Sequence, residues 1–248
     1  MRILLAVHAF PPASTAGVEV YTLRLARALA ALSHEVLVLT AVHDLGARPY
    51  AVRRRTQDGI AVAEVVNVHH RGTLEATYSD PELDAAVAPV LGDFRPDCVH
   101  LQHLLNLSTG TVREAKRLGA RVLLTLHDYW LSCPRDGLRM REDLSLCANM
   151  DHGVCARCLE TSPYLVPRLQ SSLLGALRKA GLGARLHRLH AWAPRATEAL
   201  LTLMRRAAPV RSEGLPAAMD ARARHMRKTL DEVDLVLSPS RLDRKSVV

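Results

Sequence analysis

The stretch RILLAV at residues 2–7 and the stretch EVLVLT at residues 35–40 decide the fold of this chain. Both are short, apolar and rich in β-forming residues, which predicts two buried strands. Between them, the loop AFPPASTAG at residues 9–17 precedes residues 18–32, whose apolar side chains recur at helical spacing. A strand, a helix and a second strand in this order form a crossover unit, which predicts a parallel sheet.

The alternation of strands and helices continues toward the middle of the chain. Asp58-Gly59 separates residues 51–56 from residues 60–66, and because Asp-Gly is a hairpin signal we expect these two segments to pair as strands. The other predicted elements are helices at residues 81–91 and 111–118 and strands at residues 97–101, 121–126 and 234–237. This pattern indicates an α/β fold with a doubly wound, mostly parallel sheet.

Two later segments depart from this alternation. Residues 133–160 are predicted to form a loop, and they carry four of the five cysteines. Residues 164–232 are almost all helical in pattern, with breaks at glycines and prolines. We therefore expect one domain over residues 1–242, with a Cys-rich loop and an added helical part at residues 161–232.

Composition excludes several classes of protein. The 248 residues are 48% hydrophobic and 23% charged, which is typical of a globular protein and excludes disorder, collagen and coiled coil as the main state. No apolar run reaches the about 18 residues of a membrane span. The apolar stretch after Arg2 is too short for a signal peptide, so we expect a cytoplasmic protein with reduced cysteines.

Positive charge is concentrated in the last third of the chain. Residues 1–160 hold 17 Lys+Arg against 18 Asp+Glu, whereas residues 161–248 hold 16 against 7. Because 29 of the 33 basic residues are Arg in an Ala-rich chain, part of this excess reflects GC-rich coding. The basic segment nevertheless predicts an anionic surface or acceptor as a partner.

The last six residues, DRKSVV at 243–248, can be back-translated into part of a widely used short-read sequencing adapter. We hypothesise that they are read-through rather than protein. On this hypothesis the natural chain continues after about residue 242.

Polar groups follow the predicted strands, where parallel sheets bind ligands. The loop at residues 9–17 ends in Gly17, where free N–H groups of a helix could hold phosphate. Neither a Gly-x-Gly-x-x-Gly fingerprint nor a Gly-Lys-Ser/Thr loop is present, so a plain turn is an equal alternative. Glu19 in the first helical turn could simply complement the helix dipole.

Histidines follow two other predicted strands. His127 and Asp128 come directly after residues 121–126, and His127 there could act as a base or as a donor to a hydroxyl. No Gly-x-Ser-x-Gly elbow is present, which disfavours a hydrolase triad. His100 and His103 flank another strand end, and a hydrogen-bonded structural role is the simpler interpretation of both.

The Cys-rich loop suggests a metal. Cys133, Cys147, Cys155 and Cys158 fall within 26 residues, and the last two form a Cys-x-x-Cys pair. Four thiolates could hold a structural Zn²⁺ in tetrahedral geometry, although the spacing of the first pair does not match a zinc ribbon. Reduced, packed thiols are the alternative.

The helical part raises the question of contact with a membrane surface. Residues 164–189 mix apolar positions with basic ones. A solvated helix packed on its own domain is the simpler interpretation, and a helix that lies on an anionic membrane is the alternative. Nucleic acid is a weaker candidate partner, because only 4% of residues are aromatic and no DNA-binding motif is visible. We expect no nucleic-acid partner.

Three separated groups of residues resemble glycosyltransferase family 4. The first comprises His8-Ala-Phe-Pro-Pro12, Ala16-Gly17-Val-Glu19, Leu25-Ala-x-Ala-Leu29 and His34-Glu-Val36. The second is Thr125-Leu-His-Asp-Tyr-Trp130 with Cys133-Pro-Arg135, and the third is the segment DLVLSPSR at residues 234–241. They occur in the family's order and span residues 1–242.

The resemblance implies the N-terminal, Rossmann-like half of a GT-B fold. In that architecture this half recognises the acceptor, and a second domain, with paired glutamates in Glu-x7-Glu spacing, binds the nucleotide-sugar donor. The implied activity is that of a retaining glycosyltransferase of hexosyltransferase type in polysaccharide or glycolipid synthesis, with no metal needed for catalysis. The part at residues 1–242 alone is expected to be inactive. A non-catalytic Rossmann-like binding module and a GT-B-shaped nucleotide-sugar epimerase are the alternatives.

The resemblance also implies roles for single residues. Gly17, with Ala16, would approach the donor phosphates through its backbone, and His127 would touch the transferred sugar. A second group is expected at the acceptor side or in its loops: Glu19, His103, Asp128 and Arg135. Two positions depart from the family pattern, because Ala16 and Ser33 stand where the family commonly has glycine.

Overall fold

A computed structural model describes residues 1–44, 46–67, 72–135, 137–141, 143–147, 150–160, 168–207 and 214–238. One seven-stranded sheet runs through it in the order β3-β4-β2-β1-β5-β6-β7. The strands are β1 (Arg2–Val7), β2 (Glu35–Val42), β3 (Val52–Gln57), β4 (Ile60–Val66), β5 (Cys98–Leu101), β6 (Arg121–Thr125) and β7 (Leu235–Leu237). The predicted tail at residues 243–248 lies outside the described residues.

The sheet is parallel except at one edge. β1 pairs in parallel with both β2 and β5, and the parallel pairing continues from β2 to β4, from β5 to β6 and from β6 to β7. Only β3 is antiparallel, paired with β4 across the Asp58-Gly59 turn, where both residues have positive φ. The predicted α/β, doubly wound, mostly parallel sheet is therefore confirmed.

The described helices are α1 (Gly17–Ala31), α2 (Pro81–Phe94), α3 (Gly110–Arg117), α4 (His152–Glu160), α5 (Arg168–Lys179), α6 (Gly183–Trp192), α7 (Pro194–Ala207) and α8 (Leu215–Asp231), with a short 3₁₀ turn at Glu75–Thr77. α2 runs three residues past its predicted end. It stops where Arg95 adopts a left-handed φ of 47°. The expectation of a loop throughout residues 133–160 is wrong at its end, because α4 forms there and buries Ala156 and Leu159.

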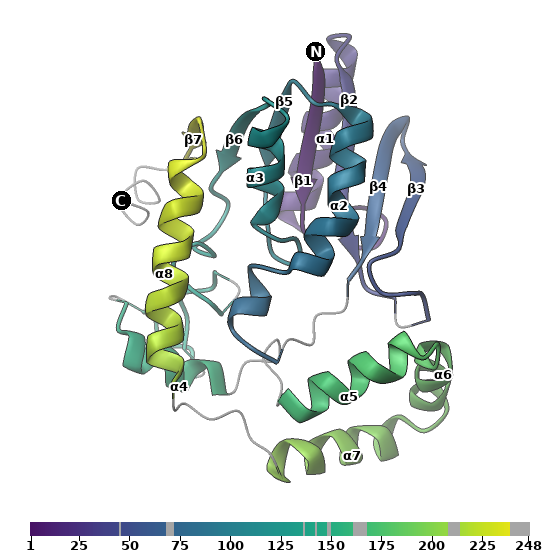
Figure 1. Ribbon diagram of the computed structural model, residues 1–248, viewed down its shortest axis with the longest axis vertical. Coiled ribbons are helices and arrows are strands. Elements are labelled where there is room, and N and C mark those ends of the chain that lie inside the picture. Colours follow the sequence, from purple (N-terminus) through teal and green to yellow (C-terminus); the bar gives the residue numbers. More distant parts are fainter. Residues whose placement is uncertain are drawn as a thin grey trace.

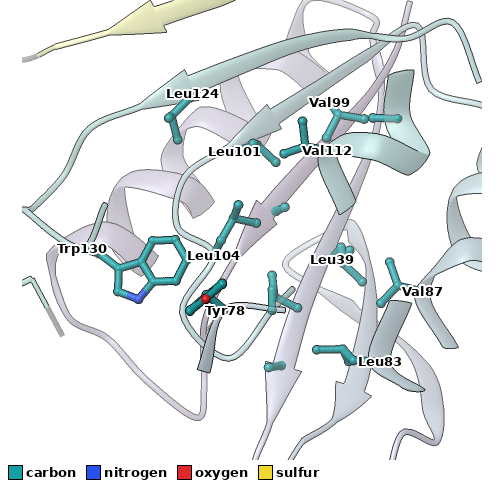
Figure 2. Packing of buried hydrophobic residues seen from close by; sticks show 14 of the residues in the cluster. Leu39, Tyr78, Leu83, Val87, Val99, Leu101, Leu104, Val112, Leu124 and Trp130 are labelled. Carbon is teal, nitrogen blue, oxygen red and sulfur yellow. The ribbon is translucent and has the colours of Figure 1, made fainter. Parts of the chain in front are cut away.

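Both faces of the sheet are covered, which follows from the strand period of two. On β1, Leu4 and Ala6 join the larger core with α2, α3, α4 and α8, whereas Ile3, Leu5 and Val7 join a second core with α1. Figure 1 shows α2 and α3 in front of the strands and α1 behind them. Figure 2 shows the larger core, where side chains of β2, β5 and β6 meet those of α2 and α3.

The strand order places a topological switch point between β1 and β5. From β1 the chain first builds outward through β2 and β4, and then returns to the other side of β1 with β5, β6 and β7. In open α/β sheets ligands bind at the carboxyl ends of the strands beside this point. The loops that follow β1, β5 and β6 all begin at this edge of the sheet.

Candidate active site

The N-terminus of α1 forms one wall of the edge at the switch point. Ala16 is its N-cap residue and supplies no side-chain hydrogen bond, so the first N–H groups of the helix are not capped by a side chain. Ala16 and Gly17 are both exposed. A Cβ built on Gly17 would meet no atom of the chain within 4 Å. The backbone here is therefore open to a ligand, and the positive end of the helix dipole favours an anion.

Glu19 holds the loop that leads into α1. It is only 2% exposed, and its carboxylate pairs with Nε2 of His8, 3.1 Å away, at the end of β1. The second carboxylate oxygen, Oε2, is buried without a hydrogen-bond partner among the described residues. The His8 ring in turn packs against that of His103, with centroids 4.6 Å apart. This chain of contacts ties the α1 entry to the loop after β5.

His127 lies at the end of β6 and faces the same edge. Its Nε2 is 2.9 Å from Oε1 of Gln102, an oxygen that can only accept, so Nε2 carries the proton and Nδ1 is the acceptor nitrogen. Burial, followed by the His103 ring, lowers the pKa of His127, although Asp128 opposes the shift. The rings of Tyr21 on α1 and His127 pack edge to face, with their centroids 5.0 Å apart. The geometry thus presents a neutral imidazole at neutral pH.

His103 and Asp128 form a fixed pair. The backbone N–H of Leu105 donates to Nδ1 of His103 over 2.9 Å, so Nε2 of His103 carries the proton and donates to Oδ2 of Asp128 over 2.7 Å. The other oxygen of Asp128 accepts the Trp130 N–H at 2.8 Å. Both nitrogens of His103 are thus engaged, which leaves it no lone pair for proton abstraction. His103 and Asp128 shape the loop that follows His127.

Asp128 is held ionised by these contacts. Burial raises the pKa of Asp128, but the hydrogen bond from His103 and its electrostatic interaction with the carboxylate, with the Trp130 N–H, outweigh it and bring the pKa below its ordinary value. Gly137 closes the loop from the other side with a φ of +75°, and a Cβ there would lie 2.7 Å from the Asp128 carboxylate. Glycine is therefore required at position 137.

His100 is a structural histidine. It is 8% exposed, and its Nε2 bonds to Oγ1 of Thr125 at 2.7 Å. Burial, with a smaller contribution from His127, lowers the pKa of His100 to about 4. It therefore stays neutral at physiological pH and joins β5 to β6.

Arg135 lies in the Cys-rich loop. Its guanidinium reaches the Met140 carbonyl at 3.5 Å and Sγ of Cys158 at 3.6 Å. These contacts lie within the Cys-rich segment, and no hydrogen bond among the described residues joins Arg135 to His127. Of the expected acceptor or loop group, the structure brings Glu19, His103 and Asp128 together and leaves Arg135 with the cysteines.

The four cysteines of that segment form no disulfide in the described part of the chain, and the other three lie near Cys155 on α4. Cys133 is buried, and the others are half-buried. Burial, followed by the neighbouring Cys133, Cys147 and Cys158, raises the pKa of Cys155 to about 11. Within the described residues, no group of three or more His, Cys, Asp or Glu is placed to hold a metal ion. A structural Zn²⁺ remains a prediction for metal analysis.

Two structural contributions to the site, from Gln102 and from α8, were not predicted from the sequence. Gln102, 1% exposed, orients His127, and its amide Nε2 has no hydrogen-bond partner among the described residues. Its position directly after β5 is the signal that could have indicated it. α8 also reaches the edge, because a pocket beside His127 and Asp128 is lined by Thr229 and Leu230 of this helix and by Val233 just after it.

α8 is fixed there by a buried arginine. Arg222 is 2% exposed and donates to the carbonyls of Trp130 and Leu131, the latter at 3.0 Å. Burial lowers the pKa of Arg222 to about 10, which still leaves it charged. The loop after His127 is therefore held by hydrogen bonds to the Asp128 carboxylate and to the Arg222 guanidinium.

Residues 16–159 match the family described as Glycosyl transferase 4-like domain. The chain belongs to this family. The matched stretch begins at the uncapped end of α1 and includes His127, Asp128 and the four clustered cysteines. The matched stretch therefore contains the loops after β5 and β6 and the start of α1, but not residues 8–15 of the loop after β1.

Solved structures of glycosyltransferases are also similar to the chain. One is the catalytic domain of starch synthase IV from Arabidopsis thaliana bound to ADP and acarbose, with 16% identity and a TM-score of 0.33 over 52% of this chain and 34% of that one. Another is described as trehalose-6-phosphate from E. coli bound with UDP-2-fluoro glucose, with 14% identity and a TM-score of 0.34 over 64% of this chain and 38% of that one. The chain thus spans little more than a third of either. No curated protein matches it.

Proposed function

We propose that this chain is the acceptor-side domain of a retaining glycosyltransferase that moves a hexosyl group from a nucleotide-sugar donor to an acceptor hydroxyl. The observation that carries the proposal is the convergence of the uncapped α1 N-terminus, Gln102 and His127 at the switch point of a glycosyltransferase-like domain. In this proposal residues 1–242 form one domain. A further domain binds most of the donor, and catalysis needs no metal.

Each side of the edge has a defined part in the proposed reaction. Negative charge develops on the leaving nucleoside diphosphate. The N–H groups at Gly17 stabilise this charge, and because the helix already holds them in position they need not reorganise during the reaction. The neutral His127 contacts the transferred sugar through Nδ1, while Gln102 fixes its ring. Glu19 and His8 hold the α1 entry, and His103 with Asp128 holds the loop beyond His127.

The acceptor in this proposal belongs to polysaccharide or glycolipid synthesis in the cytoplasm, at the inner face of the membrane. The basic helical part of the chain supports an anionic surface near the acceptor, because residues 161–248 hold 16 Lys+Arg against 7 Asp+Glu. A lipid-linked acceptor would lie at the inner face of the membrane and beside an anionic surface.

Inorganic pyrophosphate tests the phosphate subsite on the chain itself, because it carries the diphosphate of any donor without its base or sugar. We expect a titration followed by two-dimensional amide NMR to shift the N–H signals of Gly17, Val18 and Glu19. Shifts confined to the basic helices α5–α7, or no shifts, would contradict the phosphate subsite.

A further inference from the structure

The helices α5, α6 and α7 lie together beyond the lower end of the sheet in Figure 1. Among their described residues, none in α5 or α7 is buried, and in α6 only Gly183 is. Large apolar side chains are nevertheless present and exposed: Leu173, Leu189, Trp192, Leu200 and Leu203. The rest of the described chain leaves these apolar surfaces uncovered.

One face of α6 combines apolar and basic groups. The face comprises Arg185 and the residues three, four and seven positions after it, which are Arg188, Leu189 and Trp192. This spacing places all four on one side of the helix. All four are exposed, and Trp192 is 85% exposed. Among the described residues, neither arginine forms an ion pair. Hereafter these four residues are called the α6 face.

The charge around the α6 face is strongly positive. Residues 168–207 contain eight Lys+Arg and one acidic residue, Glu198, for a net charge of +7. An exposed tryptophan beside unpaired arginines suits the boundary between lipid headgroups and acyl chains, because the indole ring is apolar with one polar N–H, and arginine can reach out to phosphate.

The helices are also tied to the edge of the sheet that carries the candidate site. The Arg178 guanidinium donates to the Asp44 carbonyl at 3.4 Å, just after β2 ends, and Lys179 pairs with Glu82 at the start of α2 over 2.9 Å. The turn between α6 and α7 is closed by His190 and Thr197, whose Nδ1 and Oγ1 lie 2.7 Å apart. The α6 face is therefore held at a fixed place relative to the strand ends.

We infer that the α6 face docks the protein peripherally on an anionic phospholipid bilayer. Trp192 and Leu189 enter the headgroup boundary, and Arg185 and Arg188 bind lipid phosphates. Within the described residues, no helix has both the length and the hydrophobicity to cross a bilayer. The docking does not depend on the proposed transfer reaction, but it would bring a lipid-linked acceptor to the edge that carries His127.

Vesicle binding by the whole chain tests this inference. We expect cosedimentation with vesicles of equal parts phosphatidylglycerol and phosphatidylcholine, weakened by salt, and little binding to pure phosphatidylcholine. The Arg185→Glu, Arg188→Glu double variant should bind at least about 25-fold more weakly, since each basic residue near the surface contributes roughly fivefold. Trp192→Ser should weaken binding about tenfold.

Arg224 and Arg227 on α8 provide the matched control, because they are exposed and three residues apart like the first pair. Their double change to Glu alters net charge by the same amount and should leave most of the binding intact. Equal loss in both double variants would overturn the inference in favour of general charge attraction. Self-association of the chain without lipid, abolished by Trp192→Ser, would show that a second copy covers the α6 face and would also overturn it.

The two tryptophans give an independent readout. Trp130 is 6% exposed, whereas Trp192 is 85% exposed, so only Trp192 can change its environment on docking. Anionic vesicles should shift the fluorescence emission to the blue, and Trp192→Phe should remove that shift. An unchanged emission spectrum in the presence of bound vesicles would contradict insertion of the α6 face.

Discussion

At the scale of single residues, Gly17 and Gly137 illustrate two different demands on glycine. Position 137 needs glycine for the chain's own packing, since φ is +75° and a Cβ would strike the Asp128 carboxylate. Position 17 lies in open space, so the fold itself makes no such demand there. A requirement for glycine at position 17 would therefore come from a ligand.

Gly17→Ala separates folding from binding. Because alanine restricts the unfolded chain and suits a helix, we expect the free energy of unfolding to stay unchanged or rise by up to about 1 kcal/mol. Pyrophosphate binding should weaken by about tenfold, because the new methyl group hinders approach to the backbone. Urea denaturation and an NMR titration measure the two effects, and unchanged pyrophosphate affinity would remove Gly17 from the subsite.

Asp128→Asn tests the pair with His103. The new amide has only one acceptor oxygen, so its NH2 group would face either the Nε2–H of His103 or the Trp130 N–H. We therefore expect a loss of about 1–3 kcal/mol in the free energy of unfolding at pH 7. Since the folded pKa of Asp128 is lowered, this stabilisation is present above the ordinary pKa of about 3.9 and is lost as pH falls through the lower folded value. The difference from wild type should therefore be constant above about pH 5 and shrink in more acidic solution.

Asp93→Asn serves as the control for that measurement, because the Asp93 side chain is 78% exposed and its only described ion pair is long, at 3.9 Å to Arg54. It should change stability little at any pH. Equal stability of Asp128→Asn and wild type at pH 7 would show that the His103 contact contributes nothing to the loop.

At the scale of elements, the loop after β6 is as constrained as the strands. Asp128 accepts the Trp130 N–H, the Tyr129 N–H donates to the Gly137 carbonyl at 3.3 Å, and the Gly137 N–H donates to the Cys133 carbonyl at 3.2 Å. Arg222 on α8 adds two further hydrogen bonds to the carbonyls of this loop. His127 is thus presented by a rigid segment, although no regular strand or helix continues past it.

Gly137→Ala tests this rigidity. We expect the free energy of unfolding to fall by about 1–3 kcal/mol, because the left-handed backbone becomes strained and the methyl group displaces Asp128. Gly92→Ala is the matched control. Gly92 lies within α2 with open space at its Cβ position, so alanine there should raise stability by about 0.5–1 kcal/mol. Urea denaturation of both variants measures these free energies of unfolding. Equal stabilities of the two variants would show that the loop accommodates the added methyl group without strain.

At the scale of the whole molecule, the sequence predicted what periodicity and turn chemistry govern. The strands at residues 2–7 and 60–66 have the predicted bounds, and the Asp58-Gly59 turn sets the one antiparallel pair. α4 was missed because the Cys-rich stretch shows no long apolar period. Its helix is stabilised instead by packing against α8, which lies far along the chain.

The site was predictable in its place but less so in its contacts. Parallel strands necessarily bring the loops after β1, β5 and β6 to one edge, so the expectation for His127 and Gly17 follows from topology. The pairs His127–Gln102 and His103–Asp128 each join residues 25 positions apart, and nothing in the local pattern marks them. The buried Arg222 lies 91 positions from Leu131, beyond the reach of any motif.

The central claim is that this edge carries the transfer reaction, and a sugar-transfer assay on an enzyme that joins this chain to a donor-binding domain tests it most directly. We predict that His127→Ala lowers kcat by about 100-fold or more, while His34→Ala, at the opposite end of the sheet, leaves kcat within about twofold. Because the pKa of His127 is lowered, wild-type activity should persist below pH 6.5 before it falls. Near-normal transfer by His127→Ala would contradict the account.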